Sequence, residues 1–261
     1  MEILSTIIVI LLLFIGWLFI DFFMGRKRHL HHYKHQSFPI RESAIQLFSS
    51  GPELFSDLFS ELKKAKAHIH IQFYIVKDDE FSLEFLSILE EKASEGIEVR
   101  LLLDWRGSSK GKKLIIRQLD CTGVIYAFCH VPKPPFLFYT LQVRNHRKIT
   151  VIDGKMGYVG GFNVGKEYIN LDPILNPWRD YHLKIQGEGV QDLQQIFLKD
   201  WEKTEYLSFQ KKSRYFPPLE KGTLRHQFFA SEGFPLEDNF STLIRNSKHS
   251  ILIGTPYFIP G

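Results

Sequence analysis

Residues 145–163, NHRKITVIDGKMGYVGGFN, decide the interpretation of this chain. The stretch places His146, Lys148 and Asp153 at HxKx4D spacing and ends in Gly-Gly-x-Asn. Alternate side chains of a β-strand share one face, so we expect His146 and Lys148 to point the same way. An imidazole beside an ammonium group, on a face that lines a cleft, is suited to a phosphate substrate. The stretch therefore predicts a phosphate-handling site.

Each polar residue of this stretch has a possible chemical role. The ordinary pKa of imidazole is about 6.5, so His146 can act as a nucleophile or a proton donor near neutral pH. Lys148 supplies positive charge for phosphate oxygens, and the Asn163 amide can donate a further hydrogen bond to them. Asp153 either holds the imidazole tautomer or pairs with Lys148. The alternative, a plain hairpin turning at residues 153–154, explains neither the residue types nor their spacing.

An uncharged apolar segment, residues 3–20, lies near the start of the chain. As a helix it would extend about 27 Å, which is enough to span a bilayer. The basic residues Arg26, Lys27 and Arg28 follow this segment, whereas a cleaved signal peptide begins with them. We therefore expect an uncleaved, single-pass cell-membrane anchor, with the N-terminus outside and the rest of the chain in the cytoplasm. A buried core helix is the alternative.

A basic, histidine-rich strip follows the anchor, with the sequence RKRHLHHYKHQ. We expect it to lie along anionic lipid headgroups, which attract each Lys or Arg by roughly 1 kcal/mol. Metal binding by its histidines is the alternative, although no carboxylate or cysteine lies beside them. The net charge of +4 fits an anionic membrane or an anionic substrate. The two cysteines, Cys121 and Cys129, are expected to be buried reduced thiols, in agreement with a cytoplasmic location.

The body of the chain alternates apolar strands with amphipathic helices, which predicts an α/β fold with a sheet between helices. The expected helices are 52–66, 81–94, 110–119 and 187–203, and the expected strands are 67–76, 97–103, 124–128 and 182–186.

The proline-rich stretch VPKPPFLFYTLQVRNH leads directly into the motif. Its three prolines argue against regular structure. Its aromatic run, residues 136–139, either dips into lipid and guides acyl chains toward His146 or packs as core or as a buried strand. Arg144 and Arg147 add positive charge beside the motif.

A second polar segment, WRDYHL at residues 178–183, follows the motif. Its Arg179 and Asp180 either support a phosphate pocket or form a plain ion pair beside a strand.

The end of the chain repeats the pattern of the beginning. The segment LIRNSKHSILIGTPYFIP resembles ELKKAKAHIHIQFYIV, each being a helix followed by a strand that ends in aromatic residues. We therefore expect a second structural copy to begin there. The expected boundaries are an anchor at 1–25, a basic linker at 26–44, a first domain at 45–206, a linker at 207–222 and the start of a second domain at 223–261.

The motif resembles the first HxKx4D(x6)GGxN signature of the phospholipase D superfamily, and the chain as a whole resembles the bacterial cardiolipin synthases. The resemblance rests on the anchor, the motif, LLLDWRGS, WRDYHLKI and TPYFIP. It implies a mixed sheet flanked by helices, as the first half of a pseudo-two-fold pair. It also implies that two phosphatidylglycerol molecules give cardiolipin and glycerol through a phosphohistidine, without metal or organic cofactor. The residues implied are catalytic His146, Lys148 and Asp153, and substrate-binding Lys148, Gly161, Asn163 and Arg144.

The superfamily mechanism uses two motifs, one histidine attacking phosphorus and the other protonating the leaving alcohol, whereas this sequence contains one motif. We therefore expect an N-terminal part of a longer enzyme, completed by a C-terminal half or by a second motif-bearing chain. The alternatives are a phospholipase D-type phosphodiesterase or nuclease of the same fold, and a non-catalytic membrane-bound lipid-binding fragment. No nucleic-acid partner is expected.

Overall fold

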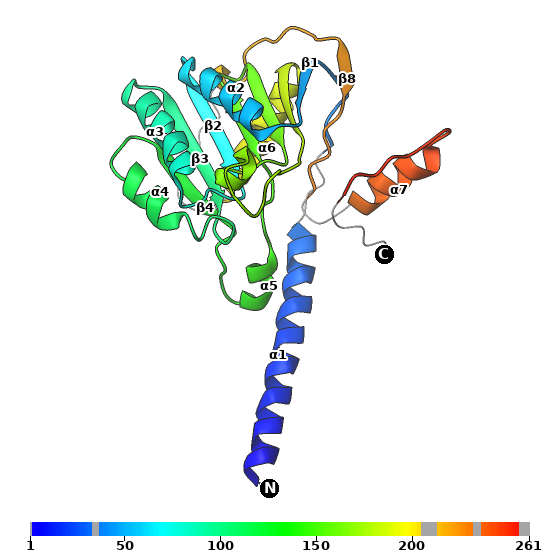
Figure 1. Cartoon of the computed structure of the whole chain (residues 1–261). Coiled ribbons are helices and arrows are strands. Elements are labelled where there is room, and N and C mark those ends of the chain that lie inside the picture. Colours follow the sequence, from blue (N-terminus) through cyan, green and yellow to red (C-terminus); the bar gives the residue numbers. More distant parts are fainter. Residues whose placement is uncertain (1, 33–36, 205–212, 232–235, 256–261) are drawn as a thin grey trace.

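The computed structural model describes residues 2–32, 37–204, 213–231 and 236–255 (Figure 1). In these residues one eight-stranded sheet has the order β4-β3-β2-β5-β6-β7-β1-β8. The strands are β1 (Arg41–Phe48), β2 (His68–Phe73), β3 (Glu98–Asp104), β4 (Ile125–Cys129), β5 (Ile149–Ile152), β6 (Met156–Gly160), β7 (His182–Gly187) and β8 (Leu224–His226).

Seven α-helices and two short 3-10 helices accompany this sheet in the described part of the chain. They are α1 (Glu2–His32), α2 (Gly51–Lys63), α3 (Glu80–Ser94), α4 (Lys112–Leu119), α5 (Leu137–Gln142), η1 (Lys166–Ile169), α6 (Gly189–Glu202), η2 (Ser213–Tyr215) and α7 (Leu236–Asn246).

The sheet is mixed, as expected. Strands β2, β3 and β4 are parallel and are joined by α3 and α4, whereas all other strand pairs are antiparallel. The hairpin β5–β6 lies at the centre of the sheet and carries the motif. The motif is therefore carried by central strands of the sheet, each of which has a neighbour on both sides.

The two faces of β2 show how the layers are built. Ile69, Ile71 and Phe73 enter the apolar cluster formed with α2, α3 and α4. The alternate residues His68 and His70 face α6, where both rings lie 3.2 Å from the Gln194 side-chain oxygen. The period of two along β2 thus gives this strand one apolar face and one face with hydrogen-bonded histidines.

The predicted helices and strands of the first domain are confirmed to within a few residues, but several boundaries change. Strand β1 begins at Arg41, inside the expected linker, and it pairs with β7 on one side and β8 on the other. Strand β8 therefore extends the same sheet, and the expected start of a second domain at residue 223 stays a prediction. The strand expected within the segment ILIGTPYFIP, residues 251–260, is not formed at 251–255, and residues 256–261 lie outside the described part of the chain.

The anchor helix also differs from the expectation, because α1 continues to His32 through the basic residues. It is long and apolar enough to cross a membrane, with a mean hydropathy of 2.9. The proline-rich segment forms the short helix α5 after its last proline. Helix α5 lies against α1, where the Tyr139 backbone N–H donates to Asp21 at 2.7 Å (Figure 1). A Cβ on Gly25 would lie 2.6 Å from the Tyr139 Cβ, so glycine permits this close approach.

Candidate active site

The segment that carries His146 and Lys148 is held from behind by two buried carboxylates. The Asn145 backbone N–H donates to Asp104 at 2.9 Å, and the Asn145 side chain donates to Asp200 at 3.0 Å. Arg147 forms an ion pair with the same Asp200. Asn145 and Arg147 therefore bind into the protein, which leaves the intervening His146 on the outer side, as alternation predicts.

His146 is exposed, and its ring rests on the ring of Tyr74 with centroids 3.8 Å apart and planes inclined by 24°. Its partial burial, followed by the charge of Lys148, lowers the pKa of His146 below its ordinary value of 6.5. The imidazole is therefore neutral at neutral pH. A neutral, accessible imidazole can attack an electrophilic phosphorus atom.

Lys148 lies next to His146. Its Nζ donates to the His146 carbonyl oxygen at 2.8 Å and lies 5.6 Å from the centre of the Tyr74 ring. Burial lowers the pKa of Lys148 to about 8, and the Asp180 carboxylate opposes that shift. At pH 7 the side chain remains mostly an ammonium ion, and it is the positive charge closest to the imidazole on the motif.

The glycine pair of the motif brings the WRDYHL segment up to the site. The Gly161 N–H donates to the Tyr181 carbonyl oxygen at 2.8 Å, and a Cβ on Gly161 would lie 1.9 Å from an Asp180 oxygen. Only glycine therefore allows Asp180 to approach so closely. His182 is buried in the same region, and its burial lowers its pKa to about 3, so its ring is neutral.

Asn163 lies at the end of the motif but is engaged within the protein. Its Oδ1 accepts from the Ile75 backbone N–H at 3.1 Å, and its Nδ2 donates to the Tyr168 hydroxyl at 3.1 Å. It therefore fixes the chain that follows β2, close to Tyr74. A hydrogen bond from the second N–H of the Asn163 amide to a substrate stays a prediction.

Asp153 does not take either of the two roles expected of it. It follows β5, whereas His146 and Lys148 precede that strand, and its carboxylate binds elsewhere. The carboxylate accepts three backbone N–H groups at the start of β2, from Lys66, Ala67 and His68, at 2.7 to 2.9 Å. The sequence spacing identified Asp153 as part of the motif. It did not show that the four residues of β5 separate Asp153 from His146 and Lys148, which lie at the opposite end of the strand.

Arg144 is also placed differently from the expectation. Its guanidinium donates to Asp104 at 3.2 Å and to the carbonyl oxygens of His130 and Thr140 at 3.1 and 2.9 Å. With its side chain 10% exposed, Arg144 ties the end of α5 to the sheet. These contacts give Arg144 a structural role, and its expected contact with a phosphate stays a prediction.

One group of possible metal ligands occurs among the described residues, formed by Asp104, Cys129 and His130. The Arg144 guanidinium and three backbone N–H groups already bind the Asp104 carboxylate. Burial raises the pKa of the Cys129 thiol to about 12, so the thiolate that binds metals is disfavoured. The donor set does not fit a cation. The expected metal alternative at the histidine strip extends to His35, which lies outside the described residues.

Three residues of the site were not identified from sequence: Tyr74, Asp104 and Asp200. Tyr74 follows β2 and Asp104 ends β3, so both lie at the carboxyl edge of parallel strands, where functional residues of α/β sheets gather. That rule could have identified them. Asp200 lies near the end of an amphipathic helix, and no local pattern distinguishes it from a surface carboxylate.

Comparison with known proteins gives a consistent result. The family model described as "Cardiolipin synthase, PLD-like domain" matches residues 58–201. Minor cardiolipin synthase ClsB of Bacillus subtilis is 36% identical over 260 residues, which cover 100% of this chain and 65% of that protein. The probable cardiolipin synthase YwiE of the same organism is 41% identical, over 84% of this chain and 45% of that protein. A cardiolipin synthase of Halalkalibacterium halodurans is 44% identical, over 82% of this chain and 44% of that protein.

These relatives are longer than this chain, which spans between 44% and 65% of their lengths. Because the family model matches more than half of the 261 residues, this chain belongs to the phospholipase D-like domain family of the cardiolipin synthases.

Proposed function

We propose that this chain carries one half-site of a membrane phosphatidyltransferase that makes cardiolipin and glycerol from two phosphatidylglycerol molecules. The observation that carries the proposal is the exposed, neutral His146 beside Lys148, on a segment fixed from behind by two carboxylates. Membership of the cardiolipin synthase family supports the choice of substrate.

In the first step an imidazole nitrogen of His146 attacks the phosphorus of one phosphatidylglycerol. A P–N bond forms and the P–O bond to the headgroup glycerol breaks, which gives a phosphatidyl-histidine. The leaving glycerol oxygen takes a proton from a general acid. In the second step a headgroup hydroxyl of another phosphatidylglycerol attacks the same phosphorus and gives its proton to the conjugate base of that general acid. The P–N bond then breaks, cardiolipin leaves and the imidazole is regenerated.

Lys148 stabilises the charge that builds up on the phosphoryl oxygens during both steps. Because burial weakens its hydration, its attraction for those oxygens is stronger than that of an exposed lysine. The Tyr74 ring limits the rotation of the imidazole by stacking on it. These two side chains therefore orient and stabilise, while His146 makes and breaks the bonds.

The general acid of the first step comes from a second motif-bearing unit, in this proposal. The 261-residue sequence contains one HxKx4D motif, and a single imidazole that has attacked phosphorus cannot also protonate the alcohol that leaves opposite to it. A C-terminal half or a second motif-bearing chain would place its histidine across the cleft from His146.

The half-site is tested with a substrate whose leaving group needs no acid. We incubate the full chain, in vesicles, with a phosphatidyl ester of p-nitrophenol, which leaves as an anion at neutral pH. We expect a rapid release of about one nitrophenolate per chain, with a phosphatidyl adduct on His146 identified by mass spectrometry. His249→Ala, which changes another exposed histidine, is the matched control and retains the release. A release that persists in His146→Ala would overturn the proposal.

Natural phosphatidylglycerol then separates the alternative activities, once the second motif-bearing unit is supplied. Cardiolipin together with glycerol supports transfer, phosphatidic acid indicates a phospholipase, and DNA cleavage without lipid turnover indicates a nuclease. If the nitrophenyl ester is inert and vesicles are still bound, the non-catalytic lipid-binding alternative is correct.

The expected orientation, with the domain in the cytoplasm, is part of the same proposal. Cys121 is exposed and Cys129 is buried, so Cys121 is a natural label for the side of the membrane on which the domain lies. A membrane-impermeant maleimide should label the chain only after the cells are made permeable, and Cys121→Ser should remove the label. Labelling in intact cells would contradict this orientation.

A further inference from the structure

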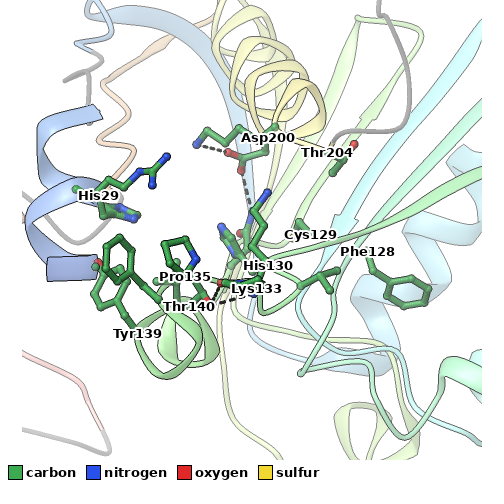
Figure 2. A pocket seen from close by; sticks show the side chains of 18 residues that line it. His29, Phe128, Cys129, His130, Lys133, Pro135, Tyr139, Thr140, Asp200 and Thr204 are labelled. Atoms are coloured by element: carbon green, nitrogen blue, oxygen red, sulfur yellow. Dashed lines mark hydrogen bonds and ion pairs between the residues drawn. The ribbon is translucent and has the colours of Figure 1, made fainter. Parts of the chain in front are cut away.

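A cavity of about 810 Å³ lies between the end of the anchor helix and the domain, away from His146. Its walls come from the last turns of α1, the proline-rich segment with α5, the end of β4 and the end of α6 (Figure 2). Figure 2 shows His29 and Tyr139 on one side of it and Asp200 and Thr204 on the other. Its volume is within the range of about 300–1,000 Å³ typical of small-molecule sites.

The cavity is separate from the reactive face of the motif. Asn145 lines it, whereas His146 and Lys148 do not. Since Asn145 binds into the protein and His146 points outward, the cavity lies behind the backbone that carries the catalytic histidine.

The position of the cavity along α1 corresponds to the headgroup layer of a membrane. The apolar run of the helix ends with Phe22, Phe23 and Met24, and the lining residues of the helix are Gly25, Arg28 and His29. At 1.5 Å per residue these lie roughly 2–8 Å beyond the last apolar residue. The headgroup layer on each side of a bilayer is about 5–8 Å thick. The cavity would thus lie at the same depth in the membrane as the lipid headgroups.

The lining combines positive charge, which suits a phosphate group, with apolar walls, which suit acyl chains. Arg28 and Lys133 contribute positive charge, and the carboxylate of Asp200 is bound by Lys203, Arg147, Gln72 and Asn145. Apolar walls face these cations, from the proline pair and the aromatic side chains of the loop. Leu137 and Leu141 on α5 stay 47% and 45% exposed, which places apolar surface beside the cavity where acyl chains would lie.

We propose that this cavity binds the headgroup of an anionic phospholipid, as a non-catalytic lipid site distinct from the His146 half-site. The phosphodiester would lie between Arg28 and Lys133, and the acyl chains would run along α5 and the apolar part of α1. A lipid bound there joins the anchor, α5 and α6, so it acts on the position of the domain at the membrane. The proposal needs a membrane-inserted chain but does not need turnover.

The test measures the lipid that stays bound to the full chain. We purify the His146→Ala chain from nanodiscs of phosphatidylglycerol or of phosphatidylcholine and count retained lipids by native mass spectrometry. This background removes the covalent chemistry of the catalytic half-site. We expect one tightly retained phosphatidylglycerol and no retained phosphatidylcholine. Combining Arg28→Gln with Lys133→Gln should lower the retention at least about tenfold, because each cation adds to the attraction for an anionic headgroup.

The matched control is Lys155→Gln, which removes an exposed lysine in the β5–β6 turn, far from the lining. It should leave the retention unchanged. Equal retention of phosphatidylcholine, or equal loss in the control and in the double variant, would overturn the proposal. Displacement of the bound species by millimolar inorganic phosphate would show a simple anion site and would also overturn it.

A second measurement does not depend on the folding of any variant. A phosphatidylglycerol with a photoreactive group in its headgroup is irradiated with the unaltered chain, and the labelled peptides are sequenced. Labels in residues 25–29 and 128–140 support the proposal. Labels confined to the segments around His146 and Asp180 would contradict it, because the lipid would then occupy only the catalytic face.

Discussion

The two ends of strand β5 carry the same motif but do different work. Before the strand, His146 and Lys148 stand on the outer side of the segment, next to Tyr74. After the strand, the Asp153 carboxylate accepts three backbone N–H groups at the start of β2. The motif therefore combines a reactive end with an architectural end, separated by four buried strand residues. Residues that recur together in a sequence need not meet in space.

The largest effect is expected at the reactive end. His146→Ala removes the proposed nucleophile, so the nitrophenolate release of the half-site should fall at least about 10³-fold. The exposed ring contributes little to the core, so the thermal unfolding midpoint should change by no more than a degree or two. Circular dichroism of the variant in detergent checks the second part. A large loss of stability would mean that the two ends of β5 are not distinct.

Asp153→Ala should give the opposite result at the architectural end. It leaves three backbone N–H groups without their acceptor, and it places alanine at a φ of +54°. We expect a loss of about 2–4 kcal/mol in the free energy of unfolding. Asp153→Asn, which keeps one acceptor oxygen and tolerates this φ, should lose less. Denaturant unfolding measures both variants, and an unchanged stability in Asp153→Ala would contradict the assignment.

The pH dependence sharpens the description of the reactive end. Below neutrality, the lowered pKa of His146 keeps the imidazole neutral to a more acidic pH than an ordinary histidine. Above neutrality, Lys148 loses its proton as the pH rises through about 8, so the charge that stabilises the phosphoryl oxygens disappears. The rate of nitrophenolate release at pH 9 should therefore be about tenfold below its value at pH 7.

Lys148→Arg is the control for this decline in rate at alkaline pH, because a guanidinium stays charged between pH 7 and pH 9. Its ratio of rates between pH 9 and pH 7 should stay near one, whatever its absolute rate. If the wild-type decline persists in this variant, another group titrates.

The smallest effect is expected for the ring beneath the imidazole. Tyr74→Leu removes an aromatic contact worth about 0.5–1.5 kcal/mol, so the rate should fall about two- to tenfold. Tyr74→Phe keeps the ring and should retain the rate. The rate of nitrophenolate release distinguishes the two variants. A lower rate in Tyr74→Phe would show that the hydroxyl acts in the reaction.

Much of the fold could be predicted from local patterns. The apolar runs of β2 and β3 and the helical spacing in α2 and α3 give elements within a few residues of those observed, because burial on one face dictates those patterns. The reactive pair was also predictable, because two residues apart on an extended segment share a face. The close approach of Asp180 to Gly161 was not predicted, because it depends on a segment that follows the motif by many residues.

The remaining features depend on contacts between distant segments. Strand β1, RESAIQLF, has a mixed polar pattern and gains its order by pairing with β7, which lies about 140 residues further along. The roles of Asp153 and Arg144 depend on which backbone groups and carboxylate the fold brings to them, at the start of β2 and the end of β3. Local spacing carries no information about either partner.

The hydrogen bond between Asp21 and the backbone N–H of Tyr139 ties the apolar helix α1 to α5, and Arg144 ties the end of α5 to the sheet. In the membrane arrangement proposed above, these contacts would hold the His146 face near the bilayer surface. Substrate would then reach that face by lateral diffusion in two dimensions.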